Sequence, residues 1–398
     1  MKKALNFFFD KFSDKKDSEQ KSFNDFTFSN KFTNNSEVNI NKFDAFGKNV
    51  IVYRAINLIA SSVASVNLKL YRNIDDKKIE VHEHPLVDLL HRPNPLMGGA
   101  DFFQNVIINK IITGNSFILA APKGMPKELY ILNSEKVTIE KGNNIFPKSY
   151  IYQAGDKKIK YIVDPFSGKS QILHLKNYNP YDELTGYSSL AAAHYSIAQH
   201  NEASKWNLSM LKNAARPSGA LTLKSSGNEP SYLNKEQYNQ LKEQLDELYT
   251  SSSNVGKPLL LQGGLDWKEL SLSPKDMDFI EAKHSNARDI ALCLGIPPQL
   301  LGIPGDSTYS NMQEARLSLW EETIIPTLDH LIDELNNWLI PMFNDQLIIS
   351  YNLDSISALS VRHEKLWKRL ESSNFLTINE KRKQVGLSPL EGGDKLWN

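Results

Sequence analysis

One stretch of the chain, residues 273–311, joins a helix with clear ends to a long irregular segment. Ser273 is a good N-cap, and Pro274 occupies the first helical position, where its missing N–H costs nothing. Gly295 is typical of a helix C-cap, and the proline pair at 297–298 cannot continue the helix. The sequence therefore predicts a helix that stops sharply and is followed by a loop without catalytic residues.

The predicted helix has one mostly apolar side. Its members recur at three- and four-residue steps, as an amphipathic helix requires. They are Met277, Ile280, His284, Ala287, Ala291 and Leu294. Cys293, the single cysteine of the chain, lies beside this side. It excludes an intramolecular disulfide, fits a reducing compartment, and is interpreted as a small buried hydrophobic residue.

Length and charge limit the function classes. A chain of 398 residues predicts two or more cooperating subdomains. Lys plus Arg equals Asp plus Glu at 46 each, so the basic excess typical of proteins that grip nucleic acid through phosphates is missing. No run of about 18 to 20 apolar residues is present, which predicts no transmembrane helix and no membrane partner.

Motifs of catalysis and metal binding are weak. The tripeptide GKS at 168–170 is the nearest match to a phosphate-binding loop, but Val163 stands where that motif requires its first glycine. His82, His84 and His91 lack the spacing of known zinc motifs and are interpreted as the entry and the exposed side of a helix. We therefore expect no catalytic residue, no cofactor and no metal.

A carboxylate group near the start of the predicted helix leaves one enzymatic alternative open. Asp276, Asp278 and Glu281 could together bind Mg²⁺ in a nuclease. Asp276 falls on a different side of the helix from the other two, and Lys283 and Arg288 offer local charge partners. A solvated or inter-subunit face is the preferred interpretation.

Local patterns predict an α+β fold. Helices are expected at 50–66, 101–113, 188–215, 234–249 and 312–343, with a kink at Pro326. Short strands are expected at 65–73, 115–121, 129–132, 137–140, 150–153, 160–163 and 171–176, between Gly and Pro turns. Further strands are expected at GALTL, PLLLQ, DWKEL and LIISYNL.

Residues 1–47 differ from the rest of the chain. They are rich in Lys, Asn, Asp and Ser, and their ten phenylalanines show neither helix nor strand spacing. The preferred interpretation is a disordered N-terminal tail. The alternative is a tether whose phenylalanines dock on a partner protein.

Seven segments in a fixed order resemble one family. They are YRAINLIASSVASV at 53–66, LLHRPNP at 89–95, GNSFIL at 114–119, NAARPSGAL at 213–221, LLLQGGLDWKELSLSP at 259–274, DMDFIEAKHSNARDIALCLGIPPQLLG at 276–302 with STYSNMQEA at 307–315, and TINEKRKQVGLSPLEGGDKL at 377–396. Together they are similar to the portal proteins of tailed bacteriophages, of the long-tailed siphophage type, which also occur in prophages and gene-transfer agents.

The resemblance implies a portal fold with a wing, a helical stem, a mixed α/β clip and a C-terminal crown, assembled as a ring. The ranges that it implies are a wing at 48–187, stem helices at 188–215 and 272–294, a clip at 216–271, a tunnel loop at 295–311, a long wing helix at 312–343 and a C-terminal wing or crown region at 344–398.

The resemblance also implies a function without chemistry. The expected protein is a homododecamer at one capsid vertex of a virion, assembled in the host bacterial cytoplasm. Its expected partners are the terminase large subunit at the clip, the head-tail connector, the major capsid protein and double-stranded DNA that passes non-specifically through the channel. The residues expected to face that DNA are Asp306, Ser307, Thr308, Tyr309, Ser310 and Asn311.

Two alternatives remain beside this interpretation. One is the metal-dependent DNA-processing enzyme, in which Asp278 and Glu281 would hold the metal. The other is a monomeric adaptor that binds the capsid. Cleavage of DNA with Mg²⁺ would favour the first, and the absence of any ring would favour the second.

Overall fold

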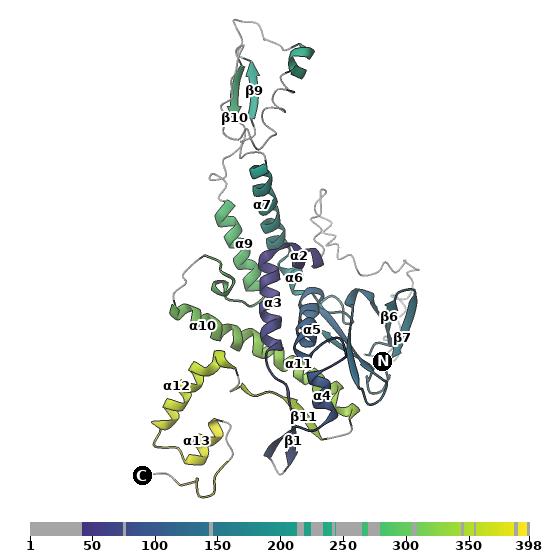
Figure 1. Ribbon diagram of the computed structural model, residues 1–398, viewed down its shortest axis with the longest axis vertical. Coiled ribbons are helices and arrows are strands. Elements are labelled where there is room, and N and C mark those ends of the chain that lie inside the picture. Colours follow the sequence, from purple (N-terminus) through teal and green to yellow (C-terminus); the bar gives the residue numbers. More distant parts are fainter. Residues whose placement is uncertain are drawn as a thin grey trace, which may run out of the picture. The chain divides into compact units, whose positions relative to one another are not determined.

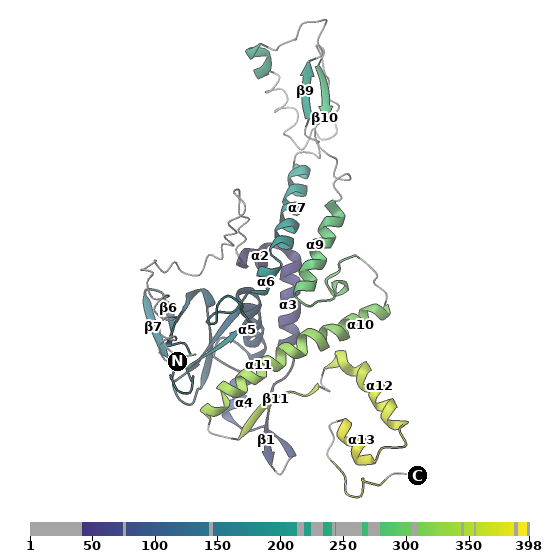
Figure 2. The same cartoon turned by 180° about the vertical axis from the view of Figure 1, so that it is seen from behind.

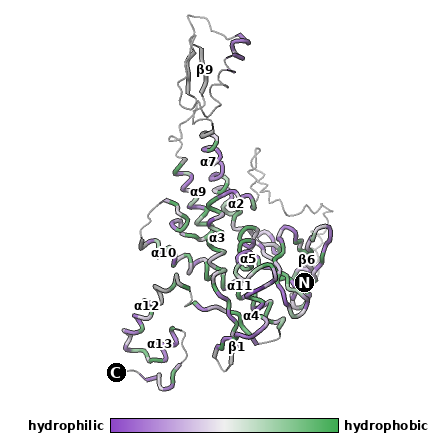
Figure 3. Tube along the Cα trace, in the orientation of Figure 1, coloured by the Kyte–Doolittle hydropathy of each residue, from purple (hydrophilic) through white to green (hydrophobic). Residues whose placement is uncertain are grey.

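The computed structural model describes residues 42–74, 77–142, 146–212, 219–223, 234–240, 243, 265–269, 279–304, 309–343, 346–353, 356–385 and 389–395. The helices and strands within these residues confirm the expected mixed fold (Figure 1). Hydrophobic residues recur along α3 (Val50–Ala64) and α5 (Gly99–Thr113), which pack against each other at the centre of the main core (Figure 3).

Helix α3 illustrates how the sequence sets a local structure. The side chain of Asn49 accepts hydrogen bonds from the backbone N–H groups of Ile51 and Val52, and so caps the helix. Buried Ile56 and Ile59 continue the apolar side at helical spacing. The predicted helix at 50–66 is therefore confirmed to within two residues.

The chain is folded before α3 begins. Helix α2 (Lys42–Lys48) buries Ala45 in the main core. The prediction that the disordered tail extends to residue 47 is therefore wrong at its C-terminal end. Helix propensity alone did not reveal that this short segment packs against α3 and α5. The remainder of the predicted tail, 1–41, lies outside the described residues.

Two antiparallel sheets follow α5. The first has the order β4-β3-β8, from β4 (Glu128–Leu132), β3 (Asn115–Ala121) and β8 (Ile172–Lys176), and the second has the order β5-β6-β7, from β5 (Val137–Glu140), β6 (Ser149–Ala154) and β7 (Lys157–Ile162). The six strands predicted in this region are present. Phe117 pairs with Leu132 and with His174 across the first sheet, and its side chain belongs to a small core with Tyr150 of the second.

A third sheet joins distant parts of the chain. Its order is β11-β1-β2, with β11 (Leu347–Ser350) beside β1 (Lys69–Ile74) and β2 (Lys77–Val81) on the other side. Leu70 pairs with Ile349 in this sheet, and both are buried. The strand at LIISYNL is confirmed. β1 overlaps the strand predicted at 65–73 but begins later, and β2 was not predicted because KKIEV is mostly polar.

Helices α7 (His194–Lys212) and α9 (Phe279–Cys293) lie side by side (Figure 1). The predicted helix at 188–215 is interrupted at Ala193, between α6 (Ser189–Ala192) and α7. Strand β10 (Leu265–Glu269) pairs with β9 (Gly219–Leu223), so DWKEL pairs with GALTL. Residues 235–240 of the helix predicted at 234–249 are helical, whereas PLLLQ lies outside the described residues.

The long helix predicted at 312–343 begins earlier. It consists of α10 (Tyr309–Leu319), the π-helical segment η4 (Trp320–Ile324) and α11 (Ile325–Trp338), and it runs as one long helical stretch (Figure 2). A kink was predicted at Pro326, and a wider π turn lies directly before this residue, in which Ile325 N donates to Trp320 O. A five-residue hydrogen bond accommodates the missing N–H of proline without ending the helix.

The apolar side of α11 is the second half of the main core. Leu328, Leu331 and Leu335 are buried there with the residues of α3 and β11. After the short helix η7 (Ser357–Leu359), the chain ends in α12 (Ser360–Glu371) and α13 (Ile378–Gln384). No helix among the described residues is long and apolar enough to cross a membrane.

We predict that Leu331→Asp lowers the free energy of unfolding by at least about 3 kcal/mol, because Leu331 is only 2% exposed and a carboxylate there has no partner. Chemical denaturation of the variant measures this loss. Asn337→Asp, at an exposed position of the same helix, is the control and should change stability little. Equal stability of the two variants would place Leu331 in solvent.

His174 predicts a pH dependence of stability. Burial lowers the pKa of His174 to about 3, with a smaller contribution from Lys176. An unfolded histidine titrates near about 6.5, so the unfolded chain takes up this proton first as the pH falls. The contribution of His174 to stability is therefore complete above about pH 6.5 and is lost as the pH falls toward about 3, by about 2 kcal/mol at about pH 5.

The variant His174→Gln should weaken this pH dependence, because glutamine stays neutral at every pH in that range. His91→Gln, at an exposed histidine, should retain it. The measurement is the free energy of unfolding at about pH 7.5 and about pH 5. An identical loss of stability in the wild type and in His174→Gln would contradict the assignment to His174.

Candidate functional site

The candidate site is the connection between α9 and α10, and it begins at a sharp helix end. Gly295 has φ +66°, in the left-handed region, and Ile296 N donates to Ala291 O over 2.9 Å. The predicted C-cap at Gly295 is therefore confirmed. Pro297 then leads into the 3₁₀ helix η3 (Pro298–Leu301).

A hydrogen bond holds this helix end to the π-helical segment. The hydroxyl of Thr323 donates to the carbonyl oxygen of Gly295 over 2.6 Å. The approach is so close that a Cβ atom on residue 295 would lie 2.7 Å from Thr323 Oγ1. Glycine is thus required at 295 both for its backbone conformation and for the space that Thr323 occupies.

The connection is attached a second time, at its other end. The side chain of Ile303 is buried against Ala287 and Ala291 of α9. Arg288 Nη2 then donates to the carbonyl oxygen of Pro304 over 2.6 Å. The first ten residues of the predicted loop, 295–304, therefore fold back onto α9 and have fixed contacts at both ends.

The structure divides the predicted DNA-facing residues into two groups. Asp306, Ser307 and Thr308 lie outside the described residues. Tyr309, Ser310 and Asn311 form the first turn of α10, so the predicted loop is three residues too long. The signal that could have shown this is the threonine directly before Tyr309, since threonine is a common N-cap residue.

Sequence reasoning missed the two residues that attach the connection. Arg288 was interpreted as a charge partner for nearby acids, but its guanidinium contacts the Pro304 carbonyl, while Glu281 is exposed. Thr323 lies 28 positions from Gly295, and nothing in the local sequence indicates the contact. Long-range hydrogen bonds of this kind require the fold to be known.

The apolar side of α9 also differs from the prediction. Ala287, Ala291 and Leu294 are buried as expected, whereas Ile280 is 71% exposed and Met277 lies outside the described residues. Leu292, which was not predicted to matter, is 79% exposed. Helix α9 therefore presents large apolar side chains to its surroundings in the isolated subunit.

Polar contacts connect the paired helices to each other and to the core. The hydroxyl of Ser196 on α7 donates to Asp289 of α9 over 3.2 Å. Buried Asn49 donates to Asn201 Oδ1 over 2.9 Å and lies 3.2 Å from His200 Nδ1. Burial lowers the pKa of His200, with a smaller contribution from Lys283, so the neutral imidazole is favoured at this junction.

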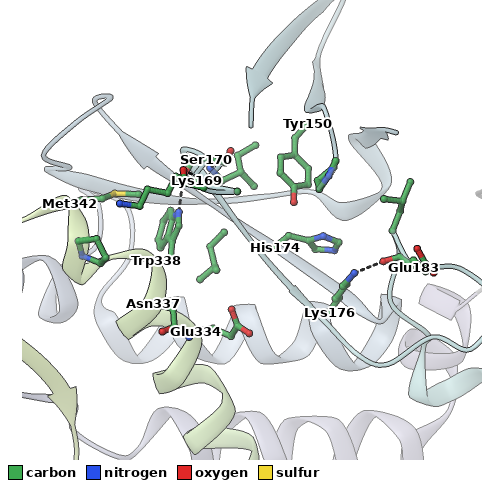
Figure 4. Close-up of a pocket in the computed structure, with 17 residues that line it drawn as sticks. Tyr150, Lys169, Ser170, His174, Lys176, Glu183, Glu334, Asn337, Trp338 and Met342 are labelled. Atoms are coloured by element: carbon green, nitrogen blue, oxygen red, sulfur yellow. Dashed lines mark hydrogen bonds between the residues drawn. The ribbon is translucent and has the colours of Figure 1, made fainter. Parts of the chain in front are cut away.

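A cavity of 330 Å³ lies elsewhere, between β8, the turn at 167–170 and α11 (Figure 4). The indole of Trp338 donates to Ser170 O over 2.9 Å, and Lys176 donates to Glu183 O. His174 stacks on Phe117 and is neutral near pH 7, so it cannot supply a proton there.

The tripeptide GKS at 168–170 forms part of this cavity wall and is a turn. Gly168 N donates to Asp164 O, and Asp164 N donates to Lys169 O. Gly168 has φ +70°, and a Cβ atom there would lie 2.8 Å from the ring of Phe146. These contacts close the turn on itself, so its amide groups do not form a phosphate-binding loop.

The candidate metal ligands are dispersed or occupied. His84 is the N-cap of α4 (Pro85–His91), since its Nδ1 accepts from Leu86 N over 3.1 Å, which confirms the predicted helix entry. Among the described residues, no three His, Cys, Asp or Glu side chains are grouped as metal ligands. Asp276 and Asp278 lie outside those residues. Burial raises the pKa of the Cys293 thiol, which disfavours the reactive thiolate.

Comparison with known proteins gives a consistent result. The family model described as "Phage portal protein" matches residues 50–386. An uncharacterized protein of Rickettsia bellii is 49% identical over 353 residues, which cover 89% of this chain and 90% of that protein. The portal protein of Enterobacteria phage HK97 is 25% identical over 352 residues, which cover 86% of this chain and 80% of that protein.

Solved structures agree with this match. One chain in the neck of an empty gene transfer agent particle, computed with sixfold symmetry, is 36% identical with a TM-score of 0.68 and covers 87% of this chain and 92% of its own. A chain in the neck of the native particle, computed with twelvefold symmetry, is 35% identical with a TM-score of 0.66 over the same shares. The range that the family model matches includes α7, α9 and the connection to α10.

We predict that Gly295→Ala lowers the free energy of unfolding by about 2 kcal/mol, because alanine disfavours positive φ and its Cβ collides with Thr323. Thr323→Ala removes the colliding hydroxyl. The double variant should therefore be less destabilised than the sum of the two single variants, by about 1 kcal/mol.

Gly302→Ala is the matched control for this cycle. Gly302 also has a positive φ, +72°, but open space surrounds the position of its Cβ. Its effect should add independently to that of Thr323→Ala. Chemical denaturation of all five variants gives the energies, and additivity of Gly295→Ala with Thr323→Ala would contradict the close contact.

Proposed function

The chain belongs to the phage portal protein family, whose role is structural, and from this membership we propose that it forms the ring-shaped DNA channel at one vertex of a capsid. The observation that carries the proposal is the likeness to the neck protein of the gene transfer agent particle, at 36% identity over 87% of this chain. Catalysis is not part of the function.

The ring is proposed to contain twelve copies in the particle, since the neck of the native gene transfer agent particle was computed with twelvefold symmetry. In this arrangement α7 and α9 are the stem, and residues 216–271 are the clip. Exposed Ile280 and Leu292 on α9 support contacts between neighbouring stems, because large apolar side chains in water mark interaction surfaces.

The remaining ranges follow from the same proposal. Residues 48–187 are the main part of the wing, 309–343 contain the long wing helix, and 344–398 complete the wing and crown. The clip is proposed to dock the terminase large subunit during genome packaging and the head-tail connector afterwards. The wing is proposed to meet the major capsid protein at the portal vertex of the virion, after assembly in the bacterial host cytoplasm.

The channel segment is proposed to be 305–311, with Asp306, Ser307 and Thr308 closest to the moving duplex. Its support is mechanical: the Thr323–Gly295 and Arg288–Pro304 hydrogen bonds fix the backbone that leads into it. Short polar side chains form weak, interchangeable hydrogen bonds with phosphates, which carry no sequence information. The equal numbers of acidic and basic residues are compatible with a channel that does not bind DNA tightly.

We predict that the triple variant Asp306→Ala, Ser307→Ala and Thr308→Ala assembles into particles but retains several-fold less DNA. The reason is that the contacts to the duplex are lost while the anchors at 295–304 remain. The measurement is nuclease-protected DNA per particle, in particles assembled with the other head proteins.

The matched control is Asp156→Ala, Lys157→Ala and Lys158→Ala, at exposed positions in the turn after β6 and at the start of β7. It should leave DNA retention unchanged. Failure of the 306–308 variant to form rings would mean that this segment is structural. A wild-type protein that stays monomeric but binds capsids would instead favour the adaptor.

A further inference from the structure

Among the described helices of the C-terminal half, acidic and basic residues are concentrated on different helices. Residues 309–338, from α10 through α11, contain six acidic residues and one basic residue. Helices α12 and α13 together contain seven basic residues and three acidic residues. Because the whole chain is balanced, this separation creates two surfaces of opposite sign on one subunit.

The acidic surface consists of Glu314, Glu322, Asp329 and Asp333. All four are exposed, and they follow the side of the long helix opposite to its buried leucines. Asp329 accepts a hydrogen bond from the Tyr351 hydroxyl over 2.9 Å. Within the part of the chain that the structure describes, the other three carboxylates form no ion pair, so their charge is available to a partner.

The basic surface consists of Lys365, Lys368 and Arg369 on α12, together with Trp367 between them. The three cations are exposed and, among the described residues, have no ion pair. Trp367 is 57% exposed. An exposed tryptophan beside arginine is typical of residues that dominate binding energy in protein interfaces.

Specific contacts hold the start of α12 and the residues that follow α13. Leu359 is buried in the main core and fixes the start of α12, and η7 contacts α10. Asn379 of α13 donates to Leu390 O over 3.0 Å and to Asp394 Oδ1 over 2.8 Å, and accepts from Leu390 N. These bonds close the last described residues onto α13, which follows α12 along the chain (Figure 2).

A ring places a specific requirement on a single chain. Its contacts are heterologous, so each subunit needs two different surfaces that fit each other, one for each neighbour. The acidic and basic surfaces are different, lie on the same chain and are complementary in sign. Electrostatic complementarity of this kind fixes register and excludes wrong pairings, even where single exposed ion pairs contribute little.

We propose that the basic surface of α12 in one copy docks on the acidic surface of the long helix in the neighbouring copy. This inference rests on the proposed ring and identifies one of its subunit contacts. Lys365, Lys368 and Arg369 pair there with Glu314, Glu322 and Asp333, and Trp367 covers part of the contact. The contact repeats at every subunit boundary of the ring.

The test is a charge exchange on the full chain. The variant with Lys365→Glu, Lys368→Glu and Arg369→Glu should form at least about tenfold fewer rings, and so should the variant with Glu314→Lys, Glu322→Lys and Asp333→Lys. Combining all six substitutions restores opposite signs across the contact and should return ring formation to near the wild-type level. Sedimentation velocity at low salt measures the fraction of protein in rings.

The matched control has Lys123→Glu, Lys157→Glu and Lys158→Glu, which lower the net charge as much as the substitutions on α12 do, at exposed positions away from both surfaces. It should form rings like the wild type. Rings at the wild-type level in both triple variants would overturn the contact. So would a failure of ring formation to recover in the variant that combines all six substitutions. Loss of DNA retention with intact rings would overturn it in favour of a DNA-facing basic surface.

Two further outcomes distinguish a failure of this contact from a failure of the proposed ring. Intact rings with a lower unfolding temperature in the triple variants would show that the two surfaces meet within one chain, and would overturn the contact between copies. A wild-type protein that forms no ring at any concentration would overturn the proposed function itself.

Discussion

The burial of the leucine seam on α11 is the interaction on which the rest of this subunit depends. Leu328, Leu331 and Leu335 pack into the same core as α3 and β11, and so join segments that lie far apart in the sequence. The same helical stretch carries Thr323, which holds the end of α9, and the acidic surface on its opposite side. Core packing, the attachment of the connection after α9 and the proposed contact surface therefore share one helical stretch.

The sequence predicted those features that depend on neighbouring residues. Gly295 and the prolines that follow it indicated the end of α9, and the Gly and Pro turns between short segments indicated β3, β5 and β8 nearly to the residue. Features that depend on distant residues were missed. The pairing of β1 with β11, the Thr323–Gly295 bond and the buried start at α2 are set by tertiary contacts, which local propensity does not contain.

The candidate site combines a fixed base with a short segment of polar residues, and its described part contains no arrangement suited to chemistry. Two hydrogen bonds and the burial of Ile303 hold 295–304 against α9. Outside the site, His174 is kept neutral by burial and stacks on Phe117, so it also contributes packing and not proton transfer. These contacts hold the backbone of 295–304 in place, which is what the proposed channel segment after it would require.

Direct imaging of the assembled protein tests this account most directly. A cryo-electron microscopy map of purified full-length chain should show a closed ring with a central hole, twelvefold in the particle like the native gene transfer agent neck, and with residues 305–308 nearest to the axis. Monomers or open chains at every concentration, or a closed ring with that segment on its outer surface, would contradict it.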